Sequence, residues 1–447
     1  MTDYVKFFRD TSPYINMHRG KTFVLALPGE GIRNDNFGHI IHDIALLSNL
    51  GIKIVLVHGA KPQVDKKLAQ GNVIPRFAPL HDSQSQATFE KDTRITDSGT
   101  MSCVKEAVGG TTIAIEALLS MDLPNSPMQG ARLRVISGNF ITAKPLGIRA
   151  GIDFHHSGEV RRIDRAGIKR QLEDGAIVLL SPLGYSPTGE AFNLTCEDVA
   201  TQTAITLEAE KLIYFCRERG ILDDQDALVK TIDMVDVRPW LRQLNEQVQL
   251  RDALQAGYDA CLHGVPRSHL ISYAEDGALL RELFTREGAG TLLSHHGGET
   301  IRQATIDDVG GVLELITPLE DSGILVKRSR ELLETEISRF QVMVHPEGMI
   351  IACAALHPFP DTDSGELACV VSHPDFHKRG LAARLLQSIE QKARDEHQLH
   401  KLFVLTTQAD HWFQEQGFKA SSLDELPTEK AALYNLQRNS KILVKTL

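Results

Sequence analysis

The segment "KTFVLALPGEGIRNDNF", residues 21–37, sets the fold of the first half of the chain. Its apolar run, residues 22–27, ends at a Pro-Gly turn, and a polar segment follows. This order predicts a buried strand, a tight turn and the start of a helix. Such a turn can offer backbone N–H groups to a phosphate. Phosphoryl transfer also needs a cation nearby, and no Lys or Arg lies between Lys21 and Arg33.

The same alternation continues outward from this segment to about residue 293. Further strands are predicted at "IKIVLVHG", "RVISGNFITA", "GAIVLLSPLG", "AEKLIYFC" and "SHLISYA". Helical patterns lie between several of them, among them "IIHDIALLSNLG" and "WLRQLNEQVQLRDALQAGYDACLHG". This pattern predicts an α/β domain at 21–293, with a mostly parallel sheet and helices on both faces. The polar segment 82–91 is expected to be a mobile surface loop.

The chain changes character after "SHHGGET", residues 294–300, which is predicted to be a linker. Antiparallel strands are expected at "FQVMVHPEGMIIACAALHPF" and "GELACVVSHP", and an amphipathic helix at "LAARLLQSIEQKARDEH". The strand "KLFVLTT" and the helix "ADHWFQEQGF" follow. The sequence therefore predicts a second, α+β domain at 301–447, which is an ordinary domain size.

The bulk properties narrow the function classes. A chain of 447 residues suits two or three domains. Its formal net charge of -10 argues against a nucleic-acid partner. We find neither an apolar run near the ~20 residues of a membrane span nor a secretory signal. The six cysteines form no C-x-x-C pair, which favours a reducing cytoplasm and no metal site.

The sharpest local pattern is "GELACVVSHPDFHKRGLAARLL", residues 365–386. A strand, a short loop and the start of a helix place successive N–H groups where they can bind an anion. Lys378 and Arg379 add positive charge, and the small residues Gly380 and Ala382 allow a diphosphate to approach the backbone. The pattern predicts a pyrophosphate site; the alternative is a plain strand–loop–helix connection with basic surface residues.

This segment resembles the acetyl-CoA loop of GNAT-type acetyltransferases, with His377 at the position that is usually Gln or Arg. The later "HWFQEQGF" is similar to the aromatic signature of that family, with Phe413 where many members have Tyr. The resemblance implies that acetyl-CoA is the co-substrate. The residues it implies for binding acetyl-CoA are Cys369, Val370, Val371, His377, Lys378, Arg379, Gly380, Leu381 and Ala382.

Acetyl transfer to an amine needs a base for the amine and a fixed donor for the thioester oxygen. Glu366, at the start of the strand before the loop, is the expected base; the alternative is an exposed carboxylate at a strand start. An N–H group near Cys369 or Val370 is the expected oxygen donor. Thr406 is the expected proton donor for the leaving thiolate, although a residue at a strand end can also simply satisfy the backbone.

Two basic clusters suggest how the acceptor is bound. Arg438 and Ser440 precede the terminal strand, and Lys327 and Arg328 follow the first helix of the second domain. Because an Arg binds a carboxylate with two hydrogen bonds, these clusters are expected to hold a dicarboxylate. The alternative for each residue is a solvated surface position.

The first domain resembles the amino acid kinase family, and most closely its N-acetylglutamate kinase branch. The resemblance rests on "VLVHGAKPQVDKKL", "RITDSGTM" and "GAIVLLSPLGYSPTGEAFNLTCEDVATQTAITLEAEKLIYFC". The two catalytic lysines of the family fall at Ala26 and at about Ala253, and its organising Asp falls at Glu197. Without the lysines, transition-state charge is unmatched, so we expect a kinase fold without kinase chemistry.

A kinase-like domain joined to a GNAT domain is similar to the bacterial N-acetylglutamate synthases over essentially the whole chain. The resemblance implies L-glutamate as acceptor and feedback inhibition by L-arginine. It places the arginine site at His269, Glu282, Gly288 and Gly290. It also implies that residues 1–20 form a helix that interlaces subunits of a homo-oligomer, a hexamer. The alternatives are an N-acetylglutamate kinase and a non-catalytic arginine sensor.

Overall fold

The computed structural model describes residues 3–78, 93–149, 151–244, 247–285, 287–294, 299–345, 348–374, 380–432 and 440–447. The chain forms two compact units, Met1–Gly297 and Gly298–Leu447. No helix of the described residues is long and apolar enough to cross a membrane.

The N-terminal unit is built on a mixed, mostly parallel sheet. Within the described residues it has eight strands, in the order β14-β16-β15-β13-β1-β2-β10-β5. All neighbouring pairs are parallel except β15 with β16. The strands are β1 (Thr22–Leu27), β2 (Lys53–His58), β5 (Val135–Ser137), β10 (Ile177–Leu180), β13 (Lys211–Cys216), β14 (Thr231–Asp233), β15 (Arg267–Ser272) and β16 (Thr291–Ser294).

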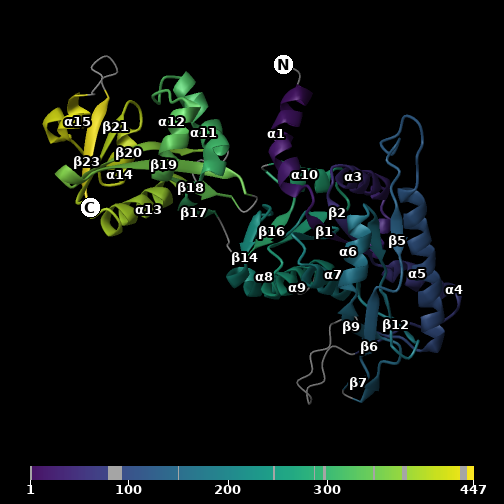
Figure 1. Ribbon diagram of the computed structural model, residues 1–447. Coiled ribbons are helices and arrows are strands. Elements are labelled where there is room, and N and C mark those ends of the chain that lie inside the picture. The colour runs from purple at the N-terminus through teal and green to yellow at the C-terminus, as the bar shows by residue number, and fades with distance from the viewer. Residues whose placement is uncertain are drawn as a thin grey trace. The chain divides into compact units, whose positions relative to one another are not determined.

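Helices cover both faces of this sheet, as the buried strands require (Figure 1). The helices α6 (Arg165–Glu173), α7 (Cys196–Leu207) and α9 (Val248–Leu262) pack with β1 and β2 in one core. The helices α3 (Phe37–Asn49) and α10 (Ala278–Phe284) lie on the other face. This arrangement confirms the predicted fold class of the first domain.

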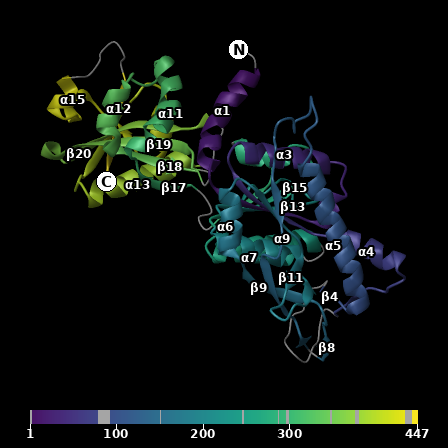
Figure 2. The same ribbon diagram turned by 45° about the vertical axis from the view of Figure 1, so that its right-hand side comes forward.

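Shorter elements complete the N-terminal unit. The helices α4 and α5 of this unit lie side by side in the views of Figure 1 and Figure 2. The remaining helices are α1 (Asp3–His18), α2 (Gly29–Ile32), α4 (Lys61–Gln70), α5 (Ser98–Leu119) and α8 (Val237–Gln243). Smaller sheets pair β3 (Arg76–Phe77) with β4 (Arg94–Ile95), β7 (Ile148–Arg149) with β8 (Ile152–Asp153), and β12 (Ala191–Asn193), β11 (Leu183–Tyr185), β6 (Ile141–Pro145) and β9 (Gly158–Ile163) in that order.

The C-terminal unit is built on a second mixed sheet. Its described residues form seven strands in the order β17-β18-β19-β20-β21-β23-β22. Only β20 and β21 are parallel neighbours; the other pairs are antiparallel. The strands are β17 (Thr300–Gln303), β18 (Phe340–Val344), β19 (Ile350–Phe359), β20 (Ser364–Ser372), β21 (Lys401–Thr406), β22 (Lys419–Ala420) and β23 (Lys441–Thr446).

Two apolar cores lie on the two faces of this second sheet. The helices α13 (Leu381–Asp395) and α14 (Asp410–Glu415) pack against one face. The helices α11 (Val309–Asp321) and α12 (Arg330–Glu336) pack against the other. The short helix α15 (Thr428–Ala432) lies near β21 and β23, where Ala431 contacts a small apolar cluster. The predicted α+β class is confirmed.

Some local predictions differ from the structure. The sequence pattern near residues 240–264 predicts one helix, but the structure has two. The helix α8 ends at Gln243, and α9 begins at Val248. The segment "RVISGNFITA" gives two strands, β5 and β6, which belong to different sheets. The predicted surface loop at 82–91 lies outside the described residues.

Candidate active site

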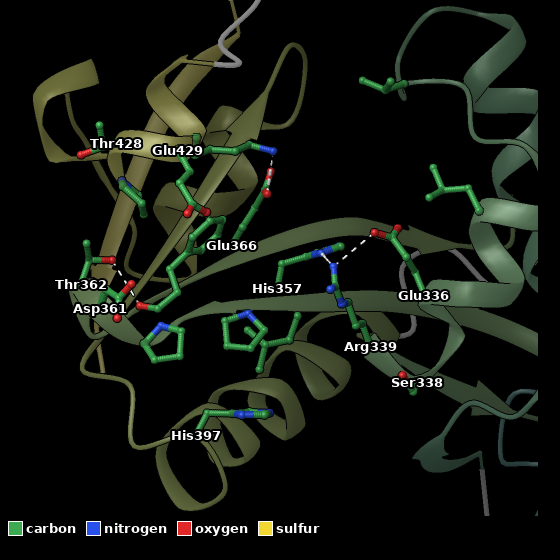
Figure 3. A pocket seen from close by; sticks show the side chains of 18 of the residues that line it. Glu336, Ser338, Arg339, His357, Asp361, Thr362, Glu366, His397, Thr428 and Glu429 are labelled. Carbon is green, nitrogen blue, oxygen red and sulfur yellow. Dashed lines mark hydrogen bonds and ion pairs between the residues drawn. The ribbon is translucent and has the colours of Figure 1, made fainter.

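A pocket of about 920 Å³ opens in the C-terminal unit beside β19, β20 and α15. Figure 3 shows several polar side chains around it, among them Glu366, His357 and Arg339. Charged side chains of both signs line it. The positive side chains are Lys327, Arg328, Arg339, Lys392 and Lys430, and the negative ones are Glu336, Asp361, Glu366 and Glu429.

The predicted base, Glu366, is the third residue of β20 and lies in the wall of this pocket. Its register partner on β19 is His357. The residue is only 8% exposed, yet its Oε2 atom lies 2.7 Å from Nζ of Lys430 on α15. A carboxylate that is mostly buried, ion-paired and directed at a pocket can act as a general base.

Beside this base, on the neighbouring strand β19, His357 is a neutral imidazole. Arg339 donates a hydrogen bond to Nδ1 of His357 at 2.8 Å, so the ring proton belongs on Nε2. Arg339 also contacts Glu336 at 3.2 Å, and Figure 3 shows it between the two residues. Burial lowers the pKa of His357 to about 4, and the nearby charges of Arg339, Arg328 and Lys430 add to the effect.

The cations around His357 make this end of the pocket suitable for an anion. Lys327 and Arg328, both predicted from the sequence, line the pocket. Arg339 and Lys430 also line it, but no sequence motif pointed to them, because they come from separate short elements that meet only in the fold. Ser440 instead lines a second pocket of about 420 Å³, with Asp410 and Lys441. Arg438 lies outside the described residues.

A bulge in β20 lies close to the base. Ala355 pairs with Ala368 and Cys353 pairs with Val371, so Cys369 and Val370 together face a single residue of β19. Cys369 has a φ of 51°, a conformation that is rare for a residue with a side chain and is common at functional sites. A bulge interrupts the ladder and leaves an N–H group free for a ligand.

The strands β20 and β21 separate just beyond Glu366. Their parallel pairing covers only Ser364 to Glu366 on β20, whereas β20 continues to Ser372 and β21 continues to Thr406. Backbone groups of β20 after Glu366 therefore have no ladder partner on the β21 side. This opening and the bulge both interrupt the strand ladder close to the candidate base.

The predicted acetyl-CoA loop follows β20 in the sequence, and the structure describes its last residues, from Gly380 on. Gly380 is the N-cap of α13 and has a φ of 72°, which favours glycine. It is exposed, Leu381 is buried in the core and Ala382 is half-buried. A 15-residue helix that begins at an exposed glycine offers N–H groups to a diphosphate. His377, Lys378 and Arg379 lie outside the described residues.

The predicted proton donor, Thr406, ends β21 and is 9% exposed. Its hydroxyl oxygen accepts hydrogen bonds from the backbone N–H groups of Ala409, at 3.0 Å, and Gln408, at 3.4 Å. This leaves its own proton available as a donor. The aromatic signature nearby has a packing role: Phe413 is buried and contacts Trp412 and Phe418 edge to face.

A second constellation lies in the N-terminal unit, where the predicted arginine-site residues meet. Glu282 of α10 accepts a hydrogen bond from Nδ1 of His269 at 2.6 Å and from the N–H groups of Ala289 and Gly290 at 2.6 and 2.8 Å. Burial acts to raise the pKa of Glu282, but these hydrogen bonds outweigh it and hold the pKa below its ordinary value. The carboxylate therefore stays ionised in a buried place.

Glycine is required at both predicted positions of this loop. A Cβ atom at Gly290 would lie 2.1 Å from the carbonyl oxygen of Leu270, and Gly288 has a φ of 64°. The sequence did not single out Lys211, whose buried Nζ lies 3.3 Å from Nε2 of His269.

The first helix reaches the same region of the N-terminal unit. His18, near its end, is buried between the rings of Phe23 and Phe284. Its Nε2 atom lies 3.0 Å from the carbonyl oxygen of Leu283, the residue after Glu282. The helix α1 is thus tied to the helix that carries the candidate arginine carboxylate.

The two family models that match the chain describe these two units. The amino acid kinase family matches residues 21–270, and the acetyltransferase (GNAT) family matches residues 315–418. The fold and the pocket therefore define a GNAT-type acetyltransferase that carries an amino acid kinase-like unit. Ala26 on β1 and Ala253 on α9, which the sequence resemblance places at the lysine positions of the kinases, are both buried.

Full-length relatives make the assignment more specific. An amino-acid acetyltransferase of Azotobacter vinelandii is 55% identical over 447 residues, 100% of both chains. One of Pseudomonas putida is 54% identical over the same length. The chain belongs to the amino-acid acetyltransferase family, as the sequence resemblance predicted.

Solved structures agree with this assignment. N-acetylglutamate synthase from Neisseria gonorrhoeae, complexed with coenzyme A and L-arginine, is 34% identical, with 99% of each chain covered and a TM-score of 0.85. The same enzyme complexed with coenzyme A and N-acetyl-glutamate is 35% identical, with 99% coverage of each chain and a TM-score of 0.61.

Proposed function

We propose that this protein transfers the acetyl group of acetyl-CoA to the α-amino group of L-glutamate, which forms N-acetyl-L-glutamate. The observation that carries the proposal is Glu366, a mostly buried carboxylate in a pocket lined by several cations. The Neisseria gonorrhoeae relative, complexed with coenzyme A and N-acetyl-glutamate, supports this choice of co-substrate and product. N-acetylglutamate is the first intermediate of arginine biosynthesis in organisms that use such a synthase, as the family resemblance implies.

Acetyl-CoA supplies an activated acyl group and a thiol leaving group. The residues that fit its binding are the exposed Gly380 at the start of α13, with Leu381 and Ala382, together with His377, Lys378 and Arg379 of the preceding loop. In this proposal the N–H groups near Cys369 and Val370 stabilise the charge that develops on the acyl oxygen, a kind of contact typically worth a few kcal/mol. Val371 continues the same edge of β20.

The acceptor is held by charge. Lys327 and Arg328 bind its carboxylates from the pocket wall, and Arg438, from the segment before β23, acts with them, whereas Ser440 lines the second pocket. Glu366 removes a proton from the α-ammonium group, directly or through one water molecule, because an amine attacks an acyl carbon only after it has lost that proton. Thr406 then provides the proton that the departing thiolate takes up.

Regulation by L-arginine belongs to the same proposal. Glu282 pairs with the guanidinium group, and His269, Gly288 and Gly290 complete the site in the N-terminal unit. The support is the ionised, buried state of Glu282 and the L-arginine in the complex of the Neisseria gonorrhoeae relative. We further infer that residues 1–20 act as an oligomerisation helix in a hexamer, that residues 294–300 link domains 21–293 and 301–447, and that the protein is cytoplasmic.

One assay tests this proposal against its rivals. The full chain is incubated with acetyl-CoA, with and without L-glutamate, and the release of thiol and the acylated product are both measured. Glutamate-dependent thiol release with formation of N-acetyl-L-glutamate is expected. Formation of ADP from ATP and N-acetylglutamate would instead identify a kinase, and arginine binding without any acetyl transfer would identify a sensor.

A further inference from the structure

Lys430 forms an ion pair with the candidate base, Glu366. Its Nζ atom lies 2.7 Å from Oε2 of Glu366, and the two side chains are only 25% and 11% exposed. Both residues line the pocket of the C-terminal unit. A short, charge-assisted contact of this kind holds the ammonium group firmly at the carboxylate.

The position of a general base fixes the position of the amine that it serves. A base must lie about 2.6–3.2 Å from the atom whose proton it takes, or reach it through one water molecule. The primary ammonium group of Lys430 meets the direct condition at Glu366. It therefore occupies the place that the acceptor ammonium must reach, and it has the same chemistry as that acceptor.

We propose that Lys430 is a self-acetylation site, so that the enzyme acetylates its own lysine when no amino acid is bound; this inference rests on the proposed function of Glu366. Lys430 Nζ gives a proton to Oε2 of Glu366, and its lone pair forms a bond to the acetyl carbon. The carbon–sulfur bond of the thioester breaks at the same centre. The thiolate leaves and takes up a proton, so the products are N-acetyllysine, coenzyme A thiol and one released proton.

Acetylation changes what Lys430 can do. The amide has no charge and cannot form an ion pair with Glu366. The acceptor amino acid competes with Lys430 for the same carboxylate, so its presence protects the lysine. Self-acetylation is thus a reaction of the free enzyme with acetyl-CoA, and saturating L-glutamate suppresses it.

The chain contains a matched control lysine. Lys445 on β23 pairs with Glu390 on α13 at 2.5 Å, with side-chain exposures of 23% and 10%. The two lysines thus have nearly the same exposure and the same kind of partner, but Lys445 does not line the pocket. Chemical acetylation in solution would modify both at similar rates, whereas the proposed reaction modifies Lys430 alone.

The test uses the full chain and acetyl-CoA as the probe. After incubation without amino acid, peptide mass spectrometry measures acetyl groups on Lys430 and Lys445. We expect Lys430 to be modified and Lys445 to remain free, and we expect Glu366→Gln to slow the modification by roughly 10²- to 10⁴-fold, the usual contribution of a general base. Glu334→Gln, which changes a paired carboxylate that does not line the pocket, should leave Lys430 modified. Added L-glutamate should prevent it.

Several results would overturn the inference. An unmodified Lys430, equal modification of both lysines, or an unchanged rate in folded Glu366→Gln would each contradict it. Glutamate-dependent thiol release in the same preparation separates the two failures. Where that release is normal and Lys430 stays free, only self-acetylation is wrong; where both are missing, the proposed function is wrong as well.

Discussion

Glu366 on β20 and His357 on β19 are direct partners in the antiparallel register of the C-terminal sheet. One is the candidate base, and the other is a neutral imidazole anchored by Arg339. Because register partners lie on the same face of a sheet, both belong to the wall of the charged pocket.

Replacing Glu366 by Gln should lower turnover by roughly 10²- to 10⁴-fold, because general-base catalysis typically contributes that much. The affinity for acetyl-CoA should be nearly unchanged, since the amide has almost the same size. Steady-state thiol release and calorimetric titration with coenzyme A measure the two quantities. Turnover equal to that of the parent protein across the pH range would show that Glu366 is not the base.

Replacing Arg328 by Ala should raise the Michaelis constant for L-glutamate by roughly 10- to 100-fold, because a hydrogen bond to a charged group contributes about 1.5–3 kcal/mol. The matched control is Arg330→Ala, since Arg330 is paired with Glu334 at 2.9 Å and does not line the pocket. Arg438→Ala should act in the same direction as Arg328→Ala. A defect confined to acetyl-CoA would assign these residues to the other substrate.

His357 predicts a particular dependence of stability on pH. Its folded-state pKa, about 4, lies below the ordinary value of 6.5, so the unfolded chain binds the extra proton first. The stabilising contribution of the neutral ring is therefore fully present above pH 6.5 and is lost as the pH falls toward 4. His357→Asn keeps an acceptor for Arg339 but does not titrate.

Thermal unfolding of the parent protein and of His357→Asn from pH 8 to pH 4 measures this contribution. The difference in unfolding free energy between the two proteins should be largest above pH 6.5 and should shrink toward pH 4. A constant difference over this range would mean that His357 titrates normally in the folded protein.

Glu282→Gln should strongly reduce inhibition by arginine. The amide keeps an acceptor for the N–H groups of Ala289 and Gly290 but removes the charge that pairs with a guanidinium. Coupling between sites is typically 1–3 kcal/mol, or about 5- to 150-fold in affinity, and it is reciprocal for binding. Glu275→Gln, in the loop before the same helix, serves as the control. Arginine titrations by calorimetry and by activity should change together in Glu282→Gln, and unaltered inhibition would exclude this carboxylate.

The sequence predicted the regular elements well where the signal is local. The strand Thr22–Leu27 was predicted with the bounds that the structure has, because a short apolar run between turn residues is a strong signal. The start of α13 after Gly380 followed from the same kind of reasoning. The sequence predicts a single strand where the structure has β5 and then β6, Ile141–Pro145, in different sheets. Which strands pair decides the sheet that each one joins, and a single sequence does not show that pairing.

The sites show the same limit more clearly. Glu366, Arg328 and Glu282 could be proposed from the sequence because each lies in or near a recognisable motif. Arg339 and Lys430 were not, because their importance comes from contacts with residues distant in the chain, His357 and Glu366. Such contacts depend on strand register and on the placement of short helices, which one sequence does not encode in any local pattern.

The most direct test of the central claim follows the acetyl group itself. Acetyl-CoA labelled in the acetyl carbonyl is mixed with the full chain and L-glutamate, and the amide product is identified by NMR. The account predicts label in N-acetyl-L-glutamate at a rate that depends on Glu366 and falls when L-arginine is added. Label that stays in acetyl-CoA, or that reaches N-acetyl-L-glutamate equally fast in folded Glu366→Gln, would contradict it.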